Sequence, residues 1–289
     1  MQKIIDTYYD INLTRTGLSK ESDAYNKKAK IIKKIEYICL SKKIKFVFDV
    51  TWKFYDHKFF ISATGTNYGI YITYPNNRFE YYIFENFIKN KKSEKKLDID
   101  LKNEINISKY NEESKYKFND TINGIAVLPN QNRIKNLDFN KLNNFIDNNK
   151  KNYIKIHPVI SPNFVDFLRK KYGNERLVES HYRLEDIMMN CNEVAITSNT
   201  ESIIPASLYN KKIYYLASDN LNNNGTESTY PLFYLCVNND ISIQTVFETD
   251  LTGLIPWSLV ENDNYIINKI ENMVKIHGQW RNSIYNCTV

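Results

Sequence analysis

The stretch at residues 153–173 reads "YIKIHPVISPNFVDFLRKKYG" and combines a strand pattern with a helix pattern. Its first part, 153–158, has the β-branched and aromatic composition of a strand and stops on His157-Pro158. Proline has no N–H to donate to a strand ladder and restrains the residue before it, so the strand should end there. Residues 161–173 then predict a helix, with Pro162 in its first turn and Gly173 at its end. A histidine is therefore expected at the carboxyl end of a strand.

The same alternation of strand and helix extends outward on both sides of this stretch. Further strands are predicted at 124–130, 176–180, 193–199 and 211–218. Helices are predicted between the strands, at 136–151, 161–173, 182–191 and 201–210. Five strands joined by helices indicate a parallel sheet in an α/β domain. Ligands of such sheets bind beyond the carboxyl ends of the strands.

A charged, polar stretch at residues 89–122 divides the chain. It is typical of a linker or an exposed loop, and a solvated helix fits its middle equally well. We therefore expect two domains, 1–120 with the linker at its end and 121–289. The first reads as a smaller, strand-rich α/β domain, with a helix at 19–43 followed by strands at 44–52, 58–65, 68–75 and 78–86.

Composition restricts the class of protein. The 289 residues carry a net charge of +6, which suits nucleotide phosphates or an anionic membrane surface as partners but lacks the clustering of a dedicated nucleic-acid binder. The four cysteines are widely spaced without a CxxC pair, so we expect reduced thiols and neither a zinc site nor a disulfide framework. No run approaches the ~20 apolar residues of a membrane span. A cytoplasmic protein is expected.

Polar residues follow the predicted strands in the parallel sheet, which contains neither GxGxxG nor GxxxxGK[ST]. Asn130 and Gln131 follow the first strand, His157 follows the second, and "TSNTES" (197–202) follows the fourth just before a helix. Helix N-termini attract anions through their unpaired N–H groups, and hydroxyl side chains would add to this effect. Considered one at a time, the hydroxyls could be ordinary helix caps, and the histidine could be a structural residue. Together on one sheet edge, they favour a phosphate site.

These motifs also carry a resemblance to a known family. "KIHP" (155–158), followed about forty residues later by "TSNTES" and then by "ASLYNKKIYYL" (206–216), resembles bacterial GT-B glycosyltransferases with a His-Pro motif and a downstream serine motif. Lipooligosaccharide sialyltransferases, polysialyltransferases and, more loosely, capsule Kdo transferases belong to this type. The resemblance covers roughly residues 120–220. It implies a GT-B-like fold, with the nucleotide sugar bound by the C-terminal domain.

The resemblance also implies an activity. Enzymes of this type are inverting and metal-independent, and they transfer sialic acid or a related acidic sugar from a CMP-activated donor. The acceptor would be a glycan or glycolipid of lipopolysaccharide or capsule biosynthesis. No cofactor is expected beside the donor substrate.

The resemblance assigns roles to individual residues. His157 would bind the donor phosphate and assist the departure of CMP, with Lys155 in the same motif and Pro158 shaping the turn. The serine motif would hold the same phosphate, through Ser198, Thr200 and Ser202. Asn130 and Gln131 would lie near the nucleotide.

The base that deprotonates the acceptor hydroxyl comes, in this family, from an acidic motif at a strand end of the N-terminal domain. Glu85 in "FENF" (84–87) fits the first position of that motif, whereas Asn86 and Phe87 depart from it. Glu85 could equally be an exposed carboxylate at a strand end. Asp49, at the end of "FVFD", is the other candidate.

Three other functions remain open on the sequence. Asp98 and Asp100 in "LDIDL" form a DxD pattern that could hold Mg²⁺ or Mn²⁺, although it lies in a charged stretch. Aromatic residues between lysines at 44–84 could stack on single-stranded nucleic acid, as in a DNA-modifying factor of a phage. The imperfect acidic motif would also fit a scaffold that has lost its activity.

A predicted amphipathic helix at 264–280 ends the chain, with an apolar face, flanking cations, and Trp280 and Tyr285 at its far end. Its apolar face could close the parallel sheet, as terminal helices commonly do. It could also contact the inner face of a membrane weakly, since apolar residues, cations and interfacial aromatics suit a membrane-surface helix.

Overall fold

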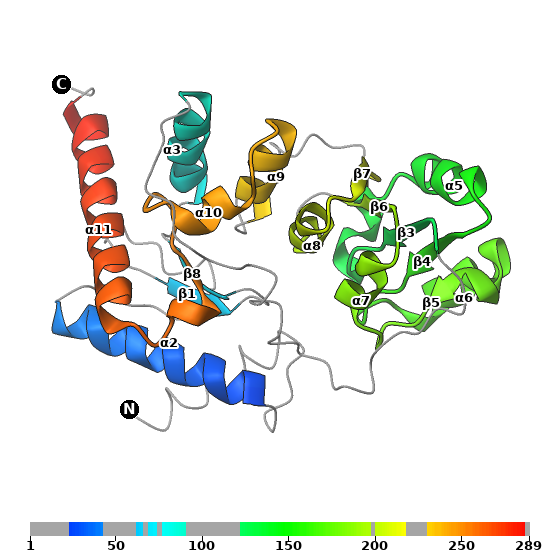
Figure 1. Ribbon diagram of the computed structural model, residues 1–289, viewed down its shortest axis with the longest axis horizontal. Coiled ribbons are helices and arrows are strands. Elements are labelled where there is room, and N and C mark those ends of the chain that lie inside the picture. Colours follow the sequence, from blue (N-terminus) through cyan, green and yellow to red (C-terminus); the bar gives the residue numbers. More distant parts are fainter. Residues whose placement is uncertain are drawn as a thin grey trace. The chain divides into compact units, whose positions relative to one another are not determined.

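The computed structural model describes residues 23–42, 62–65, 69–73, 77–90, 122–197, 200–217 and 230–286. The chain forms two compact units (Figure 1). Unit 1 comprises Met1–Lys109 together with Asn239–Val289, and unit 2 comprises Tyr110–Asn238. The boundary expected at 120/121 thus falls earlier, at 109/110, and the second unit ends at Asn238 instead of continuing to residue 289. Residues 239–289 belong with the N-terminal part of the chain.

Unit 2 contains the five predicted strands in one parallel sheet, which confirms the α/β class. Its strands are β3 (Gly124–Val127), β4 (Asn152–Lys155), β5 (Leu177–Val178), β6 (Glu193–Ile196) and β7 (Lys212–Tyr215), in the order β5-β4-β3-β6-β7. The central strand β3 pairs in parallel with β4 on one side and with β6 on the other. Gly124 begins both ladders, opposite Asn152 and Glu193.

Four described helices of unit 2 lie between the strands as predicted, with shifted ends, namely α5 (Phe139–Asn148), α6 (Pro162–Tyr172), α7 (Leu184–Met189) and α8 (Ile203–Leu208). The 3₁₀-helices η3 (Gln131–Asn136) and η4 (Asn174–Arg176), and α9 (Tyr230–Asn238) after the last strand, were not predicted. Asp138 caps α5 by accepting from the backbone N–H of Asn140 and Lys141. Pro162 lies in the first turn of α6, and Gly173, with a φ of 87°, ends it.

Apolar side chains bury both faces of the parallel sheet. On one face, Ala126, Ile154 and Ala195 pack with residues of α5 and α6, including Phe145 and Leu168. Neighbouring strand residues point to the opposite face and are also buried, namely Ile125, Val127, Val194 and Ile196. Covered faces are the rule for parallel sheets, so polar chemistry belongs at the strand ends.

Unit 1 is built on a small antiparallel sheet whose third strand comes from the far end of the chain. Strand β2 (Gly69–Thr73) pairs with β1 (Ser62–Gly65) and with β8 (Leu254–Pro256). At Gly69 a Cβ would lie 2.1 Å from the carbonyl oxygen of Ile255, so only glycine permits this close pairing. The helices in the described part of this unit are α2 (Asp23–Ser41), α3 (Asn77–Lys89), α10 (Gln244–Glu248), η6 (Trp257–Leu259) and α11 (Asp263–Asn286).

The strand predicted at 78–86 is wrong, because these residues belong to helix α3. The helix buries Phe84 and Ile88, one turn apart. The predictions at 19–43, 58–65 and 68–75 are confirmed by α2, β1 and β2, within differences at the ends. The strand predicted at 44–52 and most of the proposed linker lie outside the described residues.

The C-terminal helix α11 belongs to unit 1 and not to the unit that contains the parallel sheet. Ile266, Ile270 and Met273 on its apolar face are buried within the protein. Lys269, a cation of the same helix, is also buried and donates to the carbonyl of Thr249. These three residues of the apolar face proposed for a membrane are therefore used in packing.

Across the described parts of the chain, we find no helix with the length and apolar character needed to span a membrane.

Candidate functional site

The order of strands in unit 2 creates a switch point at its centre. From β3 the chain proceeds to β4 and then β5 on one side, and afterwards crosses to β6 and β7 on the other. The connections leaving the carboxyl ends of β3 and β6 therefore diverge. In open α/β sheets, the crevice beside such diverging connections is the usual ligand site. The residues that follow β3, β4 and β6 lie around this edge.

His157 opens a tight turn directly after β4. The N–H of Ile160 donates to the His157 carbonyl at 3.2 Å, with Pro158 as the second residue of the turn, a position that proline favours. The N–H of Val159 donates to Nδ1 of the His157 ring at 3.1 Å. His157 is half-buried, whereas Pro158 and Val159 are exposed. The proline thus shapes the turn, and the turn fixes the imidazole.

Gln131 connects the end of β3 to this turn. Its backbone N–H donates to the carbonyl of Val159 at 3.2 Å. Its side-chain Oε1 accepts from the N–H of Ser161 at 2.9 Å. Gln131 and His157, proposed from separate motifs, are therefore joined at the same edge of the sheet.

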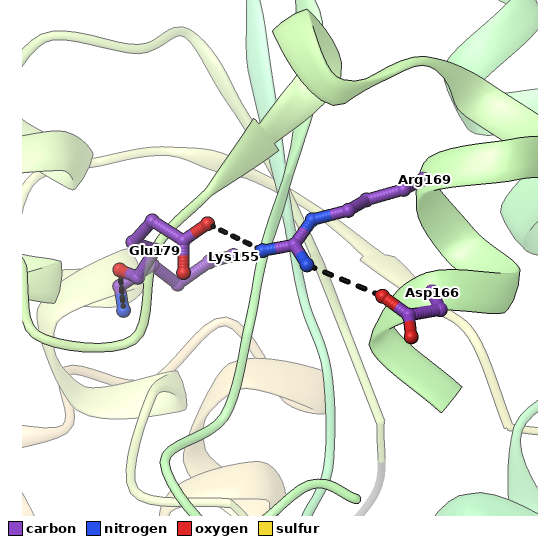
Figure 2. A network of polar contacts seen from close by, with 4 residues as sticks. All are labelled: Lys155, Asp166, Arg169 and Glu179. Carbon is purple, nitrogen blue, oxygen red and sulfur yellow. Dashed lines mark hydrogen bonds and ion pairs between the residues drawn. The ribbon is translucent and has the colours of Figure 1, made fainter. Parts of the chain in front are cut away.

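Lys155 is buried, with 4% of its surface exposed, and its ammonium group is directed to the backbone (Figure 2). Its Nζ donates to the carbonyls of Glu179 at 2.8 Å, Ser180 at 2.9 Å and Ile156 at 3.3 Å. Three carbonyl acceptors match the three donors of an ammonium group. In this structure Lys155 binds the segment that follows β5, which differs from the substrate contact expected from its place in the motif.

The segment after β5 is also held from α6 (Figure 2). Arg169 lies between two carboxylates, with Nη2 3.1 Å from Oε1 of Glu179 and Nη1 3.3 Å from Oδ1 of Asp166. These side chains are well exposed, so each pair contributes at most about 1 kcal/mol. The buried Lys155 is therefore the stronger attachment of this segment.

Asn130 lies at the switch point, between β3 and η3. Its side-chain Oδ1 is shielded from water and has no hydrogen-bond partner. The side chain does not cap η3, although Asn130 occupies the N-cap position. A buried carbonyl oxygen without a donor costs about 1–3 kcal/mol, and a ligand N–H or O–H could supply that donor.

The serine motif after β6 is described in part. Ser198 lies outside the described residues. The hydroxyl oxygens of Thr200 and Ser202 are 3.1 Å apart, and Thr200 Oγ1 also accepts from the N–H of Ser202. Ser202 is buried at the N-cap of α8 without a capping side-chain bond. The two hydroxyls thus lie together near the end of β6, and the simple capping role considered for this serine is absent.

Tyr234 is a residue of this region that sequence reasoning missed. It is fully buried in α9, and its hydroxyl donates to the carbonyl of Thr197 at 2.7 Å. Its ring lies against Tyr215, with centroids 5.7 Å apart. Burial raises the pKa of the hydroxyl, which therefore remains a donor. Tyr234 fixes the start of the serine motif. The apolar run around residue 234 gave no signal for this contact.

Glu85 does not end a strand. It lies within α3 of unit 1, and its carboxylate pairs with Lys89 one turn later at 3.3 Å. The match to the family's acidic motif required a strand end, so that basis for a catalytic role is lost. Asp49, the other candidate base, lies outside the described residues, as do Asp98 and Asp100.

Within the described ranges, no cluster of three or more histidine, cysteine, aspartate or glutamate side chains could hold a metal ion.

Comparison with known proteins gives no family. No family model matches the chain, and no curated protein matches it. Among solved structures, the chain is similar to a protein from Listeria monocytogenes assigned as a UDP-N-acetylglucosamine 2-epimerase, with 9% identity and a TM-score of 0.33. The match covers 91% of this chain and 82% of that one. A similarity at this level carries no functional argument.

Proposed function

We propose that this protein is a glycosyltransferase that binds a CMP-activated acidic sugar at the carboxyl edge of the parallel sheet in unit 2. The observation that carries the proposal is the meeting of two polar connections there. The segment after β3, with Asn130 and Gln131, is hydrogen-bonded to the His157 turn after β4. This junction flanks the switch point of a sheet order that commonly binds nucleotides.

The proposed reaction breaks the bond between the anomeric carbon and the donor phosphate oxygen, and CMP leaves with the electron pair. His157 donates a hydrogen bond to the phosphate as negative charge develops on it. Thr200 and Ser202, with Ser198, donate to the same phosphate. The acceptor oxygen forms the new bond to the anomeric carbon, and its proton passes to a base. Asp49 is the carboxylate to be tested for that role.

Asn130 supports a nucleotide as the ligand. Its unpartnered Oδ1 needs a hydrogen-bond donor. The exocyclic amine of cytosine and the ribose hydroxyls are both donors, and either would satisfy this oxygen. The choice of CMP itself rests on the resemblance of the His-Pro and serine motifs.

Ligand-induced stabilisation tests the proposal. CMP at about 100 times its Kd should raise the unfolding temperature of the protein by roughly 5–10 °C. Asn130→Ala should reduce this shift by removing the buried acceptor. Lys150→Ala is the matched control, because Lys150 is exposed in the loop that precedes β4, at the opposite edge of the sheet. Release of CMP from CMP-sialic acid should accompany binding.

Two results would replace the proposal. Stabilisation by a uridine diphosphate sugar but not by CMP would show that the assignment of a CMP-activated donor is wrong. Binding of single-stranded oligonucleotides with a steep salt dependence, without stabilisation by any nucleotide sugar, would place the protein in the nucleic-acid-binding class.

A further inference from the structure

The Gln131 side chain is exposed, yet it forms a hydrogen bond with the protein backbone. Its Oε1 accepts from the N–H of Ser161 at 2.9 Å, and its own N–H reaches the Val159 carbonyl. Ser161 is the N-cap residue of α6. Gln131 therefore holds the far end of the His157 turn, where the turn passes into the helix.

Val159 lies in the same turn and contacts the His157 ring. Its carbonyl accepts from the backbone N–H of Gln131, and its N–H donates to Nδ1 of His157 at 3.1 Å. Ser161, which the Gln131 side chain holds, follows Val159 two residues later in the same turn. A neutral imidazole has one protonated nitrogen and one acceptor nitrogen. Acceptance at Nδ1 therefore assigns the proton to Nε2. The orientation and the tautomer of the ring both depend on where the turn holds Val159.

We propose that Gln131 is a positioning residue that keeps His157 in its Nε2–H tautomer through the turn 157–161. This role replaces the nucleotide contact expected for Gln131 from the sequence. The catalytic consequence rests on the function proposed above, in which an Nε2–H donor would serve an anionic phosphate oxygen. The structural consequence, the tautomer itself, is independent of that function.

The experiment compares three variants with the wild type. Gln131→Ala removes the acceptor for Ser161, Gln131→Met removes it while keeping the length of the side chain, and Gln131→Glu restores an acceptor oxygen. Asn132→Ala is the control, because Asn132 is the exposed neighbour in η3. Nitrogen-15 NMR of the His157 ring reports the tautomer, and release of CMP from CMP-sialic acid reports kcat and KM.

We expect both tautomers in Gln131→Ala and Gln131→Met, with kcat about 10- to 100-fold lower and KM little changed, because the misplaced group acts in the transition state. Gln131→Glu should keep the Nε2–H tautomer, because it retains an acceptor oxygen for Ser161, and Asn132→Ala should resemble the wild type in both measurements. An unchanged Nε2–H tautomer in both Gln131→Ala and Gln131→Met would overturn the inference. If the wild type releases no CMP but the tautomer still depends on Gln131, the inference stands and the proposed function fails.

Discussion

At the scale of single residues, His157 combines the clearest sequence signal with a defined local geometry. Its ring is half-buried and accepts one backbone hydrogen bond, from Val159. Because the ring lies in a surface turn, its loss should leave the core of unit 2 intact. A phosphate-binding role would instead appear in turnover.

We therefore expect His157→Ala to lower kcat for CMP release by roughly 10²-fold or more, as for the loss of a charge-stabilising donor. Steady-state kinetics with CMP-sialic acid measure this effect, and circular dichroism checks the fold. His181→Ala is a suitable control, since His181 is an exposed histidine of the same unit, two residues beyond Glu179. Turnover of His157→Ala close to that of the control would assign His157 a purely structural role.

The positions of the candidate residues were predictable from the sequence, but their contacts were not. Asn130, Gln131 and His157 could be placed at one edge because each follows an apolar strand that ends on a turn signal. The hydrogen bond between Gln131 and Ser161 joins two loops that are separate in the sequence. The hydrogen bonds of Lys155 were unpredictable for a similar reason, because its acceptor carbonyl on Glu179 lies on the segment after another strand.

At the scale of elements, the predictions succeeded where hydrophobic runs were continuous and failed at 78–86. The central strands β3 and β6 are buried on both faces, so each reads as an apolar run. In 78–86, aromatic residues suggest a strand, but Ile83 is the single β-branched residue. The spacing of Phe84 and Ile88, both buried, and the pair Glu85–Lys89 satisfy the helical period instead.

Lys155 gives a prediction about an element, because it attaches β4 to the segment after β5. Lys155→Met keeps an apolar stem of similar size and leaves the carbonyls of Glu179 and Ser180 without this donor. The cost should be about 2–3 kcal/mol, which corresponds to local opening that is roughly 30- to 150-fold more frequent. Hydrogen exchange followed by mass spectrometry should therefore be faster in peptides covering 177–183.

Lys151→Met is the matched control for this variant. Lys151 is exposed and directly precedes β4 at the opposite edge of the sheet. The prediction fails if exchange across 177–183 is the same in Lys155→Met and in the control. Exchange in α2 of unit 1 should not change in either variant.

At the scale of the whole molecule, the return of the chain to unit 1 was not predictable. Strand β8 has three residues, "LIP", and its partner β2 comes from the first quarter of the sequence. Such a short segment has no periodicity to measure. The close contact at Gly69 that permits the pairing depends on a partner distant in the sequence.

The buried cysteines allow the packing of both units to be tested in one experiment. Cys39 lies in unit 1, and Cys191 and Cys236 lie in unit 2. Burial raises the pKa of their thiols, to about 12 for Cys39, about 11 for Cys191 and about 12 for Cys236. The thiolate is the reactive form, so these cysteines should resist alkylation in the folded protein.

The raised pKa values also determine how stability should depend on pH. Above about pH 9 the thiols of the unfolded chain lose protons, whereas the buried thiols of the folded chain keep theirs. The unfolded state then binds fewer protons, so the free energy of unfolding should fall as pH rises from 9 towards 11. Below pH 8 these groups should contribute no pH dependence, because they are protonated in both states.

Iodoacetamide labelling at pH 8, read by mass spectrometry of cysteine peptides, checks the folded state. We expect Cys39, Cys191 and Cys236 to be unlabelled in buffer and labelled in urea, where all four cysteines of the chain become reactive. Urea unfolding at pH 8, 9 and 10 measures the fall in stability. Rapid labelling of Cys191 and Cys236 while circular dichroism shows intact secondary structure would contradict the packing of unit 2. Selective labelling of Cys39 would limit the disagreement to unit 1.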